Sequence, residues 1–148
     1  MPVYREPPAS RVSAANIAEE YPLILTNSGK VREFFLSEGR QIDSLRRANP
    51  DPLVEIHPDT AEKLSIGEGD WVWIETRIAR VKMRVKLFDG IARDVVAAQF
   101  GWWFPEKTPH EYGWKESSMN LLYGDEEYDP DTGSESLNGT LCRVYPCG

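Results

Sequence analysis

The chain has 148 residues, of which 41% are hydrophobic and 28% are charged. This balance is typical of one soluble globular domain with enough apolar side chains for a single core. Asp and Glu total 24 against 17 Lys and Arg, so the formal net charge is -7, which argues against general affinity for nucleic acid or an anionic membrane. We therefore expect no nucleic-acid partner and no membrane contact by this chain.

The beginning of the chain does not resemble a signal peptide. Residues 1–20 carry prolines and charged side chains where a signal peptide would carry an apolar segment, and no apolar run approaches the roughly 20 residues that cross a bilayer. The simplest interpretation is a cytoplasmic protein, with export of a full-length parent left open. Cys142 and Cys147 lie within the last seven residues, where a terminal disulfide and free thiols are alternatives, and we favour free thiols.

The proline-rich opening is typical of an interdomain connector. We predict a linker or entry segment over residues 1–20, with at most a short helix over residues 14–20 that Ser13 would cap. Residues 21–148 are predicted to form one packed domain.

Short apolar runs bounded by Gly, Pro and Asn predict the strands of that domain. About six strands are expected, over residues 21–26, 53–56, 71–76, 79–87, 94–100 and 140–145. Two short helices are expected over residues 40–48 and 57–64, and two long irregular segments over residues 101–118 and 124–139. Two short helices are too few to cover a parallel sheet. The pattern therefore favours a mainly β fold with short helices, in the form of a small β-barrel.

The clearest alternation predicts a half-buried strand with one basic face. Within residues 79–87, apolar side chains alternate with Arg80, Lys82, Arg84 and Lys86. Phosphate or RNA binding is one interpretation of this face. A solvated or interfacial face is the favoured interpretation, and the acidic segment 125–135 is a candidate partner for it.

Catalytic signatures are absent. The chain has no phosphate-binding glycine motif, no nucleophile elbow, no zinc-ligand spacing and two distant histidines, His57 and His110. His57 precedes Pro58 at a strand-to-helix junction and is interpreted as structural. We expect no catalytic residue and no metal ligand in this chain.

The loop after the first strand is a candidate ligand site. Small hydrogen-bond donors and a cation follow one another there, as Thr26, Asn27, Ser28, Gly29 and Lys30. Such a loop suits phosphate or polyol oxygens, and an ordinary polar turn is an equal alternative. Segment 30–47 carries five cations and three acids, a local charge of +2, which favours an anionic ligand, although a solvated helix face also explains it.

Tryptophans gather in the first long segment, as Trp102, Trp103 and Trp114. Such rings either plug the end of a barrel or wall a ligand site or domain interface. Asn120 follows in an apolar setting, and a buried Asn would need partners, for which a ligand is one candidate.

Six blocks of residues then resemble, in order, the C-terminal dinucleotide-binding domain of molybdopterin oxidoreductases of the dimethylsulfoxide reductase family. The blocks are residues 21–25, 37–46, 52–61, 66–72, 101–105 and 119–122. The resemblance covers residues 21–145, nearly the whole chain.

The resemblance implies a fold, a cofactor and a set of contacts. It implies a double-psi β-barrel, a six-stranded closed barrel of the aspartate-decarboxylase-like kind, that covers part of a bis(molybdopterin guanine dinucleotide) cofactor holding Mo or W. Carried over by position, Thr26–Lys30 would lie at the pterin-phosphate end. Ser37, Arg40 and Gln41 would contact the pterin region, and Trp102, Trp103 and Asn120 would line the cofactor side.

The family's metal ligand and iron–sulfur cysteines lie in other domains, so the resemblance implies that this chain alone does not catalyse. Our first hypothesis is the C-terminal domain of a larger oxidoreductase, whose partners are the remaining domains and, as a further candidate, an iron–sulfur electron-transfer subunit. The alternative is a stand-alone β-barrel subunit that docks on a catalytic partner through its Trp-rich loop. A free-standing enzyme is disfavoured because no nucleophile-and-base pair is evident.

Overall fold

The computed structural model describes residues 4–28, 31–125 and 128–148. Six strands in this part of the chain close into a barrel in the order β1-β5-β2-β4-β3-β6. Their bounds are β1 Leu23–Asn27, β2 Leu53–Ile56, β3 Trp71–Glu75, β4 Arg80–Leu87, β5 Val95–Ala98 and β6 Thr140–Pro146. The expected mainly β, closed six-stranded fold is confirmed.

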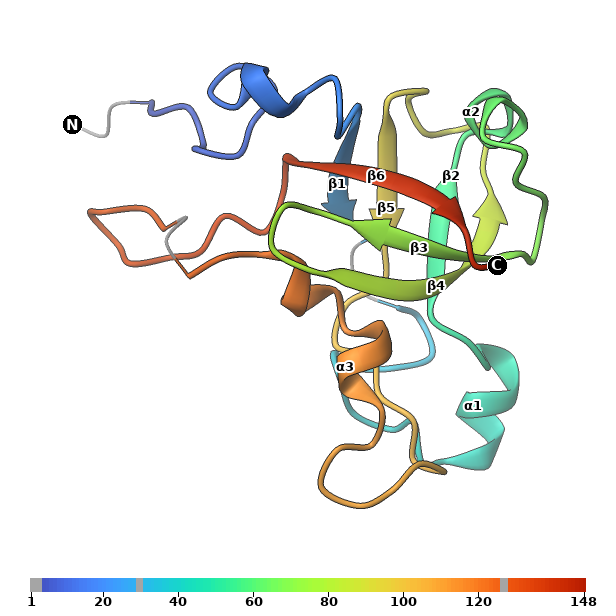
Figure 1. Cartoon of the computed structure of the whole chain (residues 1–148). Helices are drawn as coiled ribbons and strands as arrows, with labels where there is room; N and C mark the ends of the chain where they lie inside the picture. Colours follow the sequence, from blue (N-terminus) through green and yellow to red (C-terminus); the bar gives the residue numbers. More distant parts are fainter. Residues whose placement is uncertain (1–3, 29–30, 126–127) are drawn as a thin grey trace.

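Two parallel pairs determine where the long segments leave the barrel. β1 runs parallel to β5 and β2 runs parallel to β4, whereas the other neighbours are antiparallel. Because β1 and β5 end at the same side, residues 31–42 and 99–113 extend from one end of the barrel, which we call the loop end (Figure 1). Helices α1 (Asp43–Ala48) and α3 (Trp114–Ser117) lie at the loop end, and α2 (Pro58–Lys63) lies at the other end.

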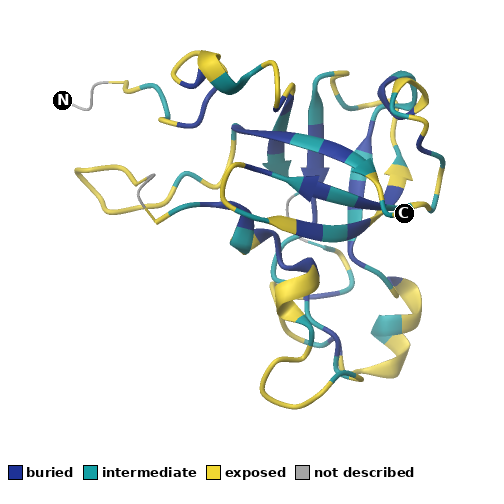
Figure 2. Cartoon of the chain, in the orientation of Figure 1, coloured by how far each residue is buried: buried dark blue, intermediate teal, exposed yellow. Residues whose placement is uncertain are grey.

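Alternation along β4 builds the barrel core. Val81, Met83 and Val85 are at most 1% exposed, and the cations between them point outward. The buried interior of the barrel contrasts with the exposed hairpin of residues 128–139 and with the outer face of α1 (Figure 2). A second apolar cluster of Phe34, Trp102 and Phe104 fills the loop end.

Helix α2 begins as the sequence predicts. His57 is its N-cap, and its Nδ1 accepts a hydrogen bond from the Asp59 backbone N–H at 3.1 Å. Pro58 occupies the first turn, where its missing N–H costs nothing. The structural interpretation of His57 is confirmed.

Part of the predicted linker packs on the barrel wall. The Leu141 backbone N–H donates to the Ala9 carbonyl at 3.2 Å, and Arg11 binds both Asp94 and the Pro22 carbonyl at 2.8 and 2.7 Å. The short helix expected over residues 14–20 is a 3-10 helix, η1 (Ala15–Ile17). The entry segment therefore contributes contacts to the barrel from Ala9 onward.

Two details of the sequence prediction were wrong. Segment 101–118 is not wholly irregular, because α3 forms at residues 114–117 and a 3-10 helix, η2 (Met119–Leu122), follows it. The ion pairs found for the basic face of β4 are not with the acidic segment: Arg84 binds Asp51 and Lys86 binds Glu55, each at 2.7 Å. Glu55 lies directly opposite Lys86 on the neighbouring strand, so the register supplies a closer partner.

No helix in the described part of the chain is long and apolar enough to cross a membrane.

Candidate functional site at the loop end

The two segments that extend from the loop end are joined at Ser37. The Trp103 indole Nε1–H donates to the Ser37 carbonyl at 2.5 Å. Gly101 lies against the same residue with φ +62, and a Cβ added to it would stand 3.3 Å from the Ser37 Cβ. This spacing is tighter than most contacts of a Cβ, and the positive φ also favours glycine over a residue with a side chain. Residues more than 60 positions apart thus form one rim.

Behind this rim, aromatic rings and guanidinium groups alternate in a stack. The Arg40 guanidinium carbon lies 4.7 Å from the ring centroid of Phe34 and 4.5 Å from that of Trp102. That of Arg46 lies 5.4 Å from the Trp102 ring and 5.6 Å from the Phe104 ring. Each distance is within the range of cation–π attraction. The stack holds residues 34–46 against residues 102–104.

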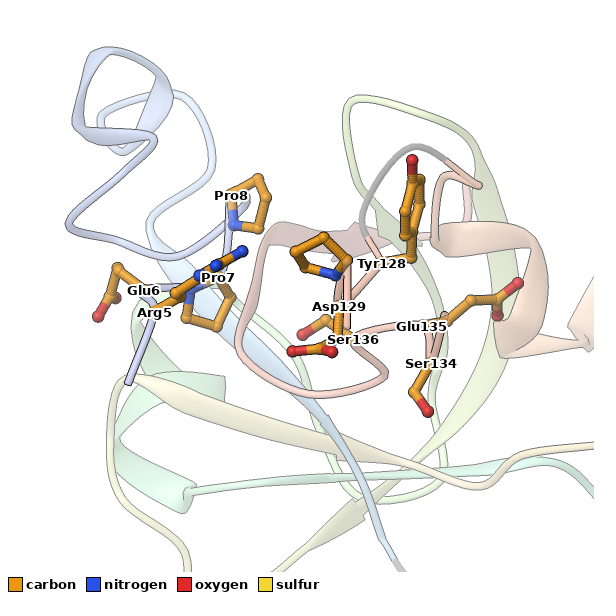
Figure 3. Close-up of a pocket in the computed structure, with 10 residues that line it drawn as sticks. Arg5, Glu6, Pro7, Pro8, Tyr128, Asp129, Ser134, Glu135 and Ser136 are labelled. Carbon is orange, nitrogen blue, oxygen red and sulfur yellow. The ribbon is translucent and has the colours of Figure 1, made fainter. Parts of the chain in front are cut away.

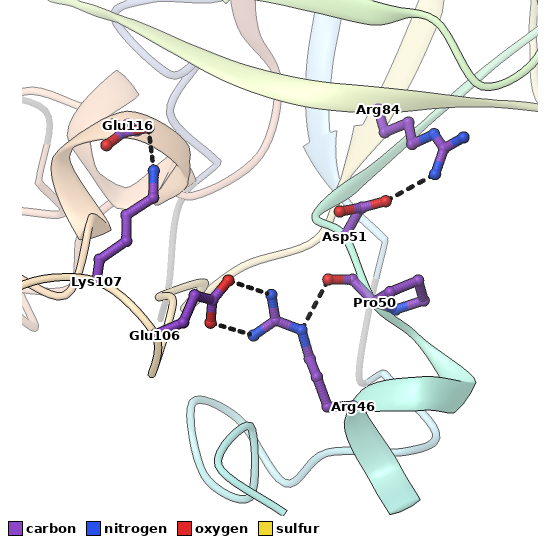
Figure 4. A network of polar contacts seen from close by, with 7 residues as sticks. All are labelled: Arg46, Pro50, Asp51, Arg84, Glu106, Lys107 and Glu116. Carbon is purple, nitrogen blue, oxygen red and sulfur yellow. Dashed lines mark hydrogen bonds and ion pairs between the residues drawn. The ribbon is translucent and has the colours of Figure 1, made fainter. Parts of the chain in front are cut away.

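Arg46 ends the stack with further polar contacts. Its Nε–H donates to the Pro50 carbonyl at 2.7 Å, and its two terminal nitrogens donate to the Glu106 carboxylate at 3.1 and 3.4 Å (Figure 4). This two-point pairing fixes α1 to the segment after β5.

Arg40 is the buried charge of this site. It is 0% exposed, and its terminal nitrogens donate to the Leu36 and Phe100 carbonyls at 3.0 and 3.3 Å. Its Nε has no hydrogen-bond partner in the described part of the chain. Within the described residues it forms no ion pair. Burial, followed by the charge of Arg46, lowers the pKa of Arg40 to about 10, so the group is still charged at neutral pH. A positive charge without a counter-charge therefore lies behind the rim.

Two neighbouring hollows open in front of the rim, and we call them the aromatic hollows. One, of about 530 Å³, is lined by Gln41, Trp103, Pro105 and Tyr112. The other, of about 330 Å³, is lined in part by Ser37, Gly101, Trp103, Tyr112, Trp114 and Ser118. Trp103 and Tyr112 belong to both, with ring centroids 5.5 Å apart and planes at 71°. The hollows thus share an aromatic wall with polar groups at its base.

Backbone strain concentrates in the segments that form these hollows. Leu36, His110 and Tyr112 have φ of 53, 77 and 44, in the left-handed region that side chains disfavour. Such conformations cost free energy and cluster at functional sites. The strain therefore marks the same end of the barrel as the buried charge.

Comparisons with known proteins agree with this geometry. A sequence model of the family described as "Molydopterin dinucleotide binding domain" matches residues 23–141. This chain belongs to that family. The resemblance to the C-terminal domain of the dimethylsulfoxide reductase family is confirmed.

The relatives of this dinucleotide-binding domain are much longer proteins. Dopamine dehydroxylase of Eggerthella lenta is 36% identical over 145 residues, which cover 98% of this chain and 14% of that protein. Acetylene hydratase of Syntrophotalea acetylenica is 32% identical, and the match covers 99% of this chain and 21% of that protein. The solved structure of acetylene hydratase from Pelobacter acetylenicus matches with a TM-score of 0.92, at 32% identity, over 99% of this chain and 21% of that one. The chain spans between 14% and 21% of the length of these relatives.

The structure separates the predicted site residues of this domain into groups. Ser37, Gln41 and Trp103 line the aromatic hollows, and the stack behind them contains Arg40 and Trp102, both at most 1% exposed. Trp102 also borders the smaller hollow from behind, whereas Arg40 lines neither hollow and supports the rim through its ring contacts. Tyr112 and Ser118 line the hollows and were not predicted, because nothing in their local sequence marks them.

The loop after β1 lies beside a different hollow. Ser28 lines a hollow of about 320 Å³, and Arg32, Lys86 and Gln99 also line it. Thr26 and Asn27 are occupied elsewhere, since the Asn138 Oδ1 accepts hydrogen bonds from the Thr26 hydroxyl at 2.6 Å and from the Asn27 backbone N–H at 3.1 Å. Gly29 and Lys30 lie outside the described residues.

Asn120 differs from the expectation of a buried polar residue. It is exposed, and its segment instead buries Met119 and Leu122 in the barrel core. The 3-10 geometry of η2 turns these two apolar side chains inward and leaves Asn120 on the outside.

A further pocket, of about 350 Å³, lies between residues 5–8 and the hairpin of residues 128–136. Figure 3 shows Pro7, Pro8 and Tyr128 around it, with the Asp129 and Glu135 carboxylates nearby. Hydrogen bonds from Thr132 lower the pKa of Asp129. Among the residues described, no group of three or more His, Cys, Asp and Glu side chains could hold a metal ion.

Proposed function

We propose that this domain covers one side of a molybdopterin guanine dinucleotide cofactor, with the aromatic hollows turned toward the ligand. The proposal extends to a bis(molybdopterin guanine dinucleotide) form with Mo or W, bound by a larger oxidoreductase. The observation that carries it is the buried, uncompensated charge of Arg40, whose Nε has no partner, behind a rim of aromatic and polar groups.

The residues at the rim suit a flat, anionic ligand. A planar heterocycle can stack on the exposed faces of Trp103 and Tyr112, and Ser37 and Gln41 offer polar groups to its edge. Gly101 leaves room where a Cβ would press on Ser37. A ligand that carries phosphate groups would bring a negative counter-charge near the buried guanidinium of Arg40.

The domain's own residues would bind the ligand, orient it and shield one face of it from water. In this proposal Trp103 and Tyr112 exclude water from one face of the ligand, and Ser37 and Gln41 fix its orientation. Arg40 acts from behind, because its charge lowers the energy of an anion at the rim. Ser28, with Arg32 and Lys86, offers a second polar surface for the phosphate end. When bound, the metal and its pterin supply the oxidation–reduction chemistry, and we assign no catalytic residue to this chain.

Partners follow from the exposed rings at the loop end. Phe35 is 59% exposed, Trp114 40% and Tyr112 38%, which favours cover by protein at this end. We propose the remaining domains of a parent oxidoreductase as that cover, with an iron–sulfur subunit as a further partner and the cytoplasm as the location. The same rings would serve a stand-alone subunit that docks on a catalytic chain, and co-purification with a separate large subunit would favour that alternative.

The test uses a soluble pterin, neopterin, as the probe. Amide and indole signals of the ¹⁵N-labelled chain are followed during a titration, and shifts are expected at Ser37, Gln41 and the Trp103 indole. Trp103→Leu should weaken binding, whereas the control Trp73→Leu, in β3 beside Arg80, should not. Shifts confined to residues 80–86 would refute the assignment.

A further inference from the structure

The outward face of the β3–β4 hairpin is a surface that the proposed function does not use. Val72 and Ile74 are buried in the core, so the side chains that alternate with them point outward. The register sets these side chains directly opposite cations of β4, in the pairs Trp71–Arg84, Trp73–Lys82 and Glu75–Arg80. We call these six residues the basic wall. No helix of the described chain covers it in Figure 1, and none of the six lines an aromatic hollow.

Protection of a sheet edge does not explain the cations of this wall. Charged side chains on a strand often serve to block pairing with another chain at a free edge. β4 has no free edge, because the closed barrel places it between β2 and β3. The contacts of the individual cations therefore have to show what their charges are for.

Two of the three cations of the basic wall lack a counter-charge. The Arg84 guanidinium binds Asp51 at 2.7 Å and is neutralised there. Arg80 and Lys82 form no ion pair within the described residues. The Arg80 guanidinium donates instead to a neutral group, the Tyr145 hydroxyl, at 3.3 Å.

The carboxylate nearest to Arg80 is already occupied. Glu75 lies opposite Arg80 in the register, but it accepts hydrogen bonds from Arg143 on β6, at 2.7 Å, and from the Tyr145 hydroxyl. Two positive charges two positions apart on one face of β4 thus stand side by side without a carboxylate of their own. Like charges in this arrangement repel, and a negative group from outside would relieve the repulsion.

Each of these two cations lies over a tryptophan ring. The Arg80 guanidinium carbon is 4.5 Å from the ring centroid of Trp73, and the Lys82 Nζ is 5.1 Å from that of Trp71. Both distances are within the range of cation–π attraction, which holds the charges beside the rings. Both rings are partly exposed on the outside of the barrel. Tryptophan and arginine are the residues in which protein interfaces concentrate their binding energy.

We propose that the basic wall docks an acidic surface of another protein. Carboxylates of that partner would bind Arg80 and Lys82, and an apolar side chain between them would lie on the faces of Trp71 and Trp73. Charge complementarity argues for an acidic partner, and the rings argue for one that also carries apolar side chains. A nucleic acid fits less well, because the net charge of -7 repels a polyanion and only two free cations face it.

A pair of model peptides tests the charge and the place of binding. The ¹⁵N-labelled full chain is titrated with the peptide Glu-Glu-Leu-Asp-Glu-Glu-Leu-Asp and with a version in which lysine replaces every acid. The acidic peptide should shift the indole signals of Trp71 and Trp73 and leave that of Trp103 in place. The lysine peptide should shift none of them. Added salt should weaken binding of the acidic peptide, because salt screens exposed charges.

Charge-removing variants locate the contact on the wall. Arg80→Gln and Lys82→Gln should each weaken the acidic peptide by about two- to fivefold, the range expected for one exposed ion pair. The control Lys63→Gln removes the same charge from an exposed position of α2, at the other end of the barrel, and should leave the affinity unchanged. The melting temperature of each variant, measured alongside, shows whether a weaker affinity reflects a loss of folded protein. An equal loss of affinity in Lys63→Gln would overturn the inference, because net charge rather than the wall would then attract the peptide.

The remaining outcomes also decide against the inference. Unshifted Trp71 and Trp73 signals would overturn it. Tighter binding of a thymidine oligonucleotide at the same two indoles would assign the wall to nucleic acid, and a dimer in sedimentation that Lys82→Gln dissociates would assign it to a second copy of this chain. The neopterin titration reports on the loop end, so the proposed function and this inference can each fail alone.

Discussion

The close approach at Gly101 gives the sharpest stability prediction. Alanine at this position would hold φ near +62, at a cost of about 1–2 kcal/mol for a residue with a Cβ. Its Cβ would also stand 3.3 Å from the Ser37 Cβ and 3.5 Å from the Ser37 Cα and N. These are backbone-anchored atoms that cannot swing aside, so a further ~1 kcal/mol is expected. Gly101→Ala should thus destabilise the fold by about 2–3 kcal/mol.

Gly133 is the matched control for this change. Its φ is +71, and an added Cβ would meet nothing within 4 Å, so Gly133→Ala carries the conformational cost without the contact. Urea denaturation followed by tryptophan fluorescence gives both free energies of unfolding, and their difference isolates the contact with Ser37. The reasoning is refuted if Gly101→Ala costs no more than Gly133→Ala.

Three further changes test the site and the barrel. Arg46→Ala should lower the free energy of unfolding by about 2 kcal/mol, because it removes three hydrogen bonds and two ring contacts. Arg47→Ala, at an exposed position, should stay within about 0.5 kcal/mol of wild type in the same denaturation assay. The pKa of Glu75 is lowered by its hydrogen bond from Tyr145 and by a neighbouring guanidinium, so its stabilisation is complete above its ordinary pKa and is lost as pH falls through the lowered value. Melting temperatures from pH 6 to pH 3 should therefore fall less steeply in Glu75→Gln, and an unchanged acid slope would contradict this. The Tyr123 hydroxyl is buried and has no hydrogen-bond partner among the residues that the structure describes, so Tyr123→Phe should be neutral or stabilise by up to about 1 kcal/mol. A clear loss of stability in calorimetry would contradict this.

The barrel could be predicted because its signals are local. The alternation in β4 fixes which side chains enter the core, and the Pro58 turn and N-cap fix the start of α2. The pairing of β1 with β5 is not local, since it joins residues about 70 positions apart. The strand pattern and the scarcity of helix favoured a small β-barrel, and the order of the family blocks implied its closed double-psi form.

The site was less accessible to sequence reasoning because it depends on which way neighbouring side chains point. Trp102 and Trp103 are consecutive and equally apolar, yet they differ in burial and in their contacts. Trp102 is 1% exposed inside the stack, and Trp103 faces the hollows. A single sequence shows two tryptophans there, and no alternation of apolar and polar neighbours indicates which of the two is buried.

For the cations of segment 30–47, too, the sequence does not show which side chains reach the surface. Their excess suggested an anionic ligand on the assumption that every cation reaches the surface. Arg40 and Arg46 instead lie between aromatic rings. The positive charge that a ligand at the rim would meet therefore comes in part from a buried group. A buried charge is screened less by salt and by water than an exposed one. One guanidinium behind the rim can thus act on an anion more strongly than its distance from the surface suggests. The buried Arg40, which has no ion-pair partner among the described residues, therefore supports a ligand at this end of the barrel more than the count of cations does.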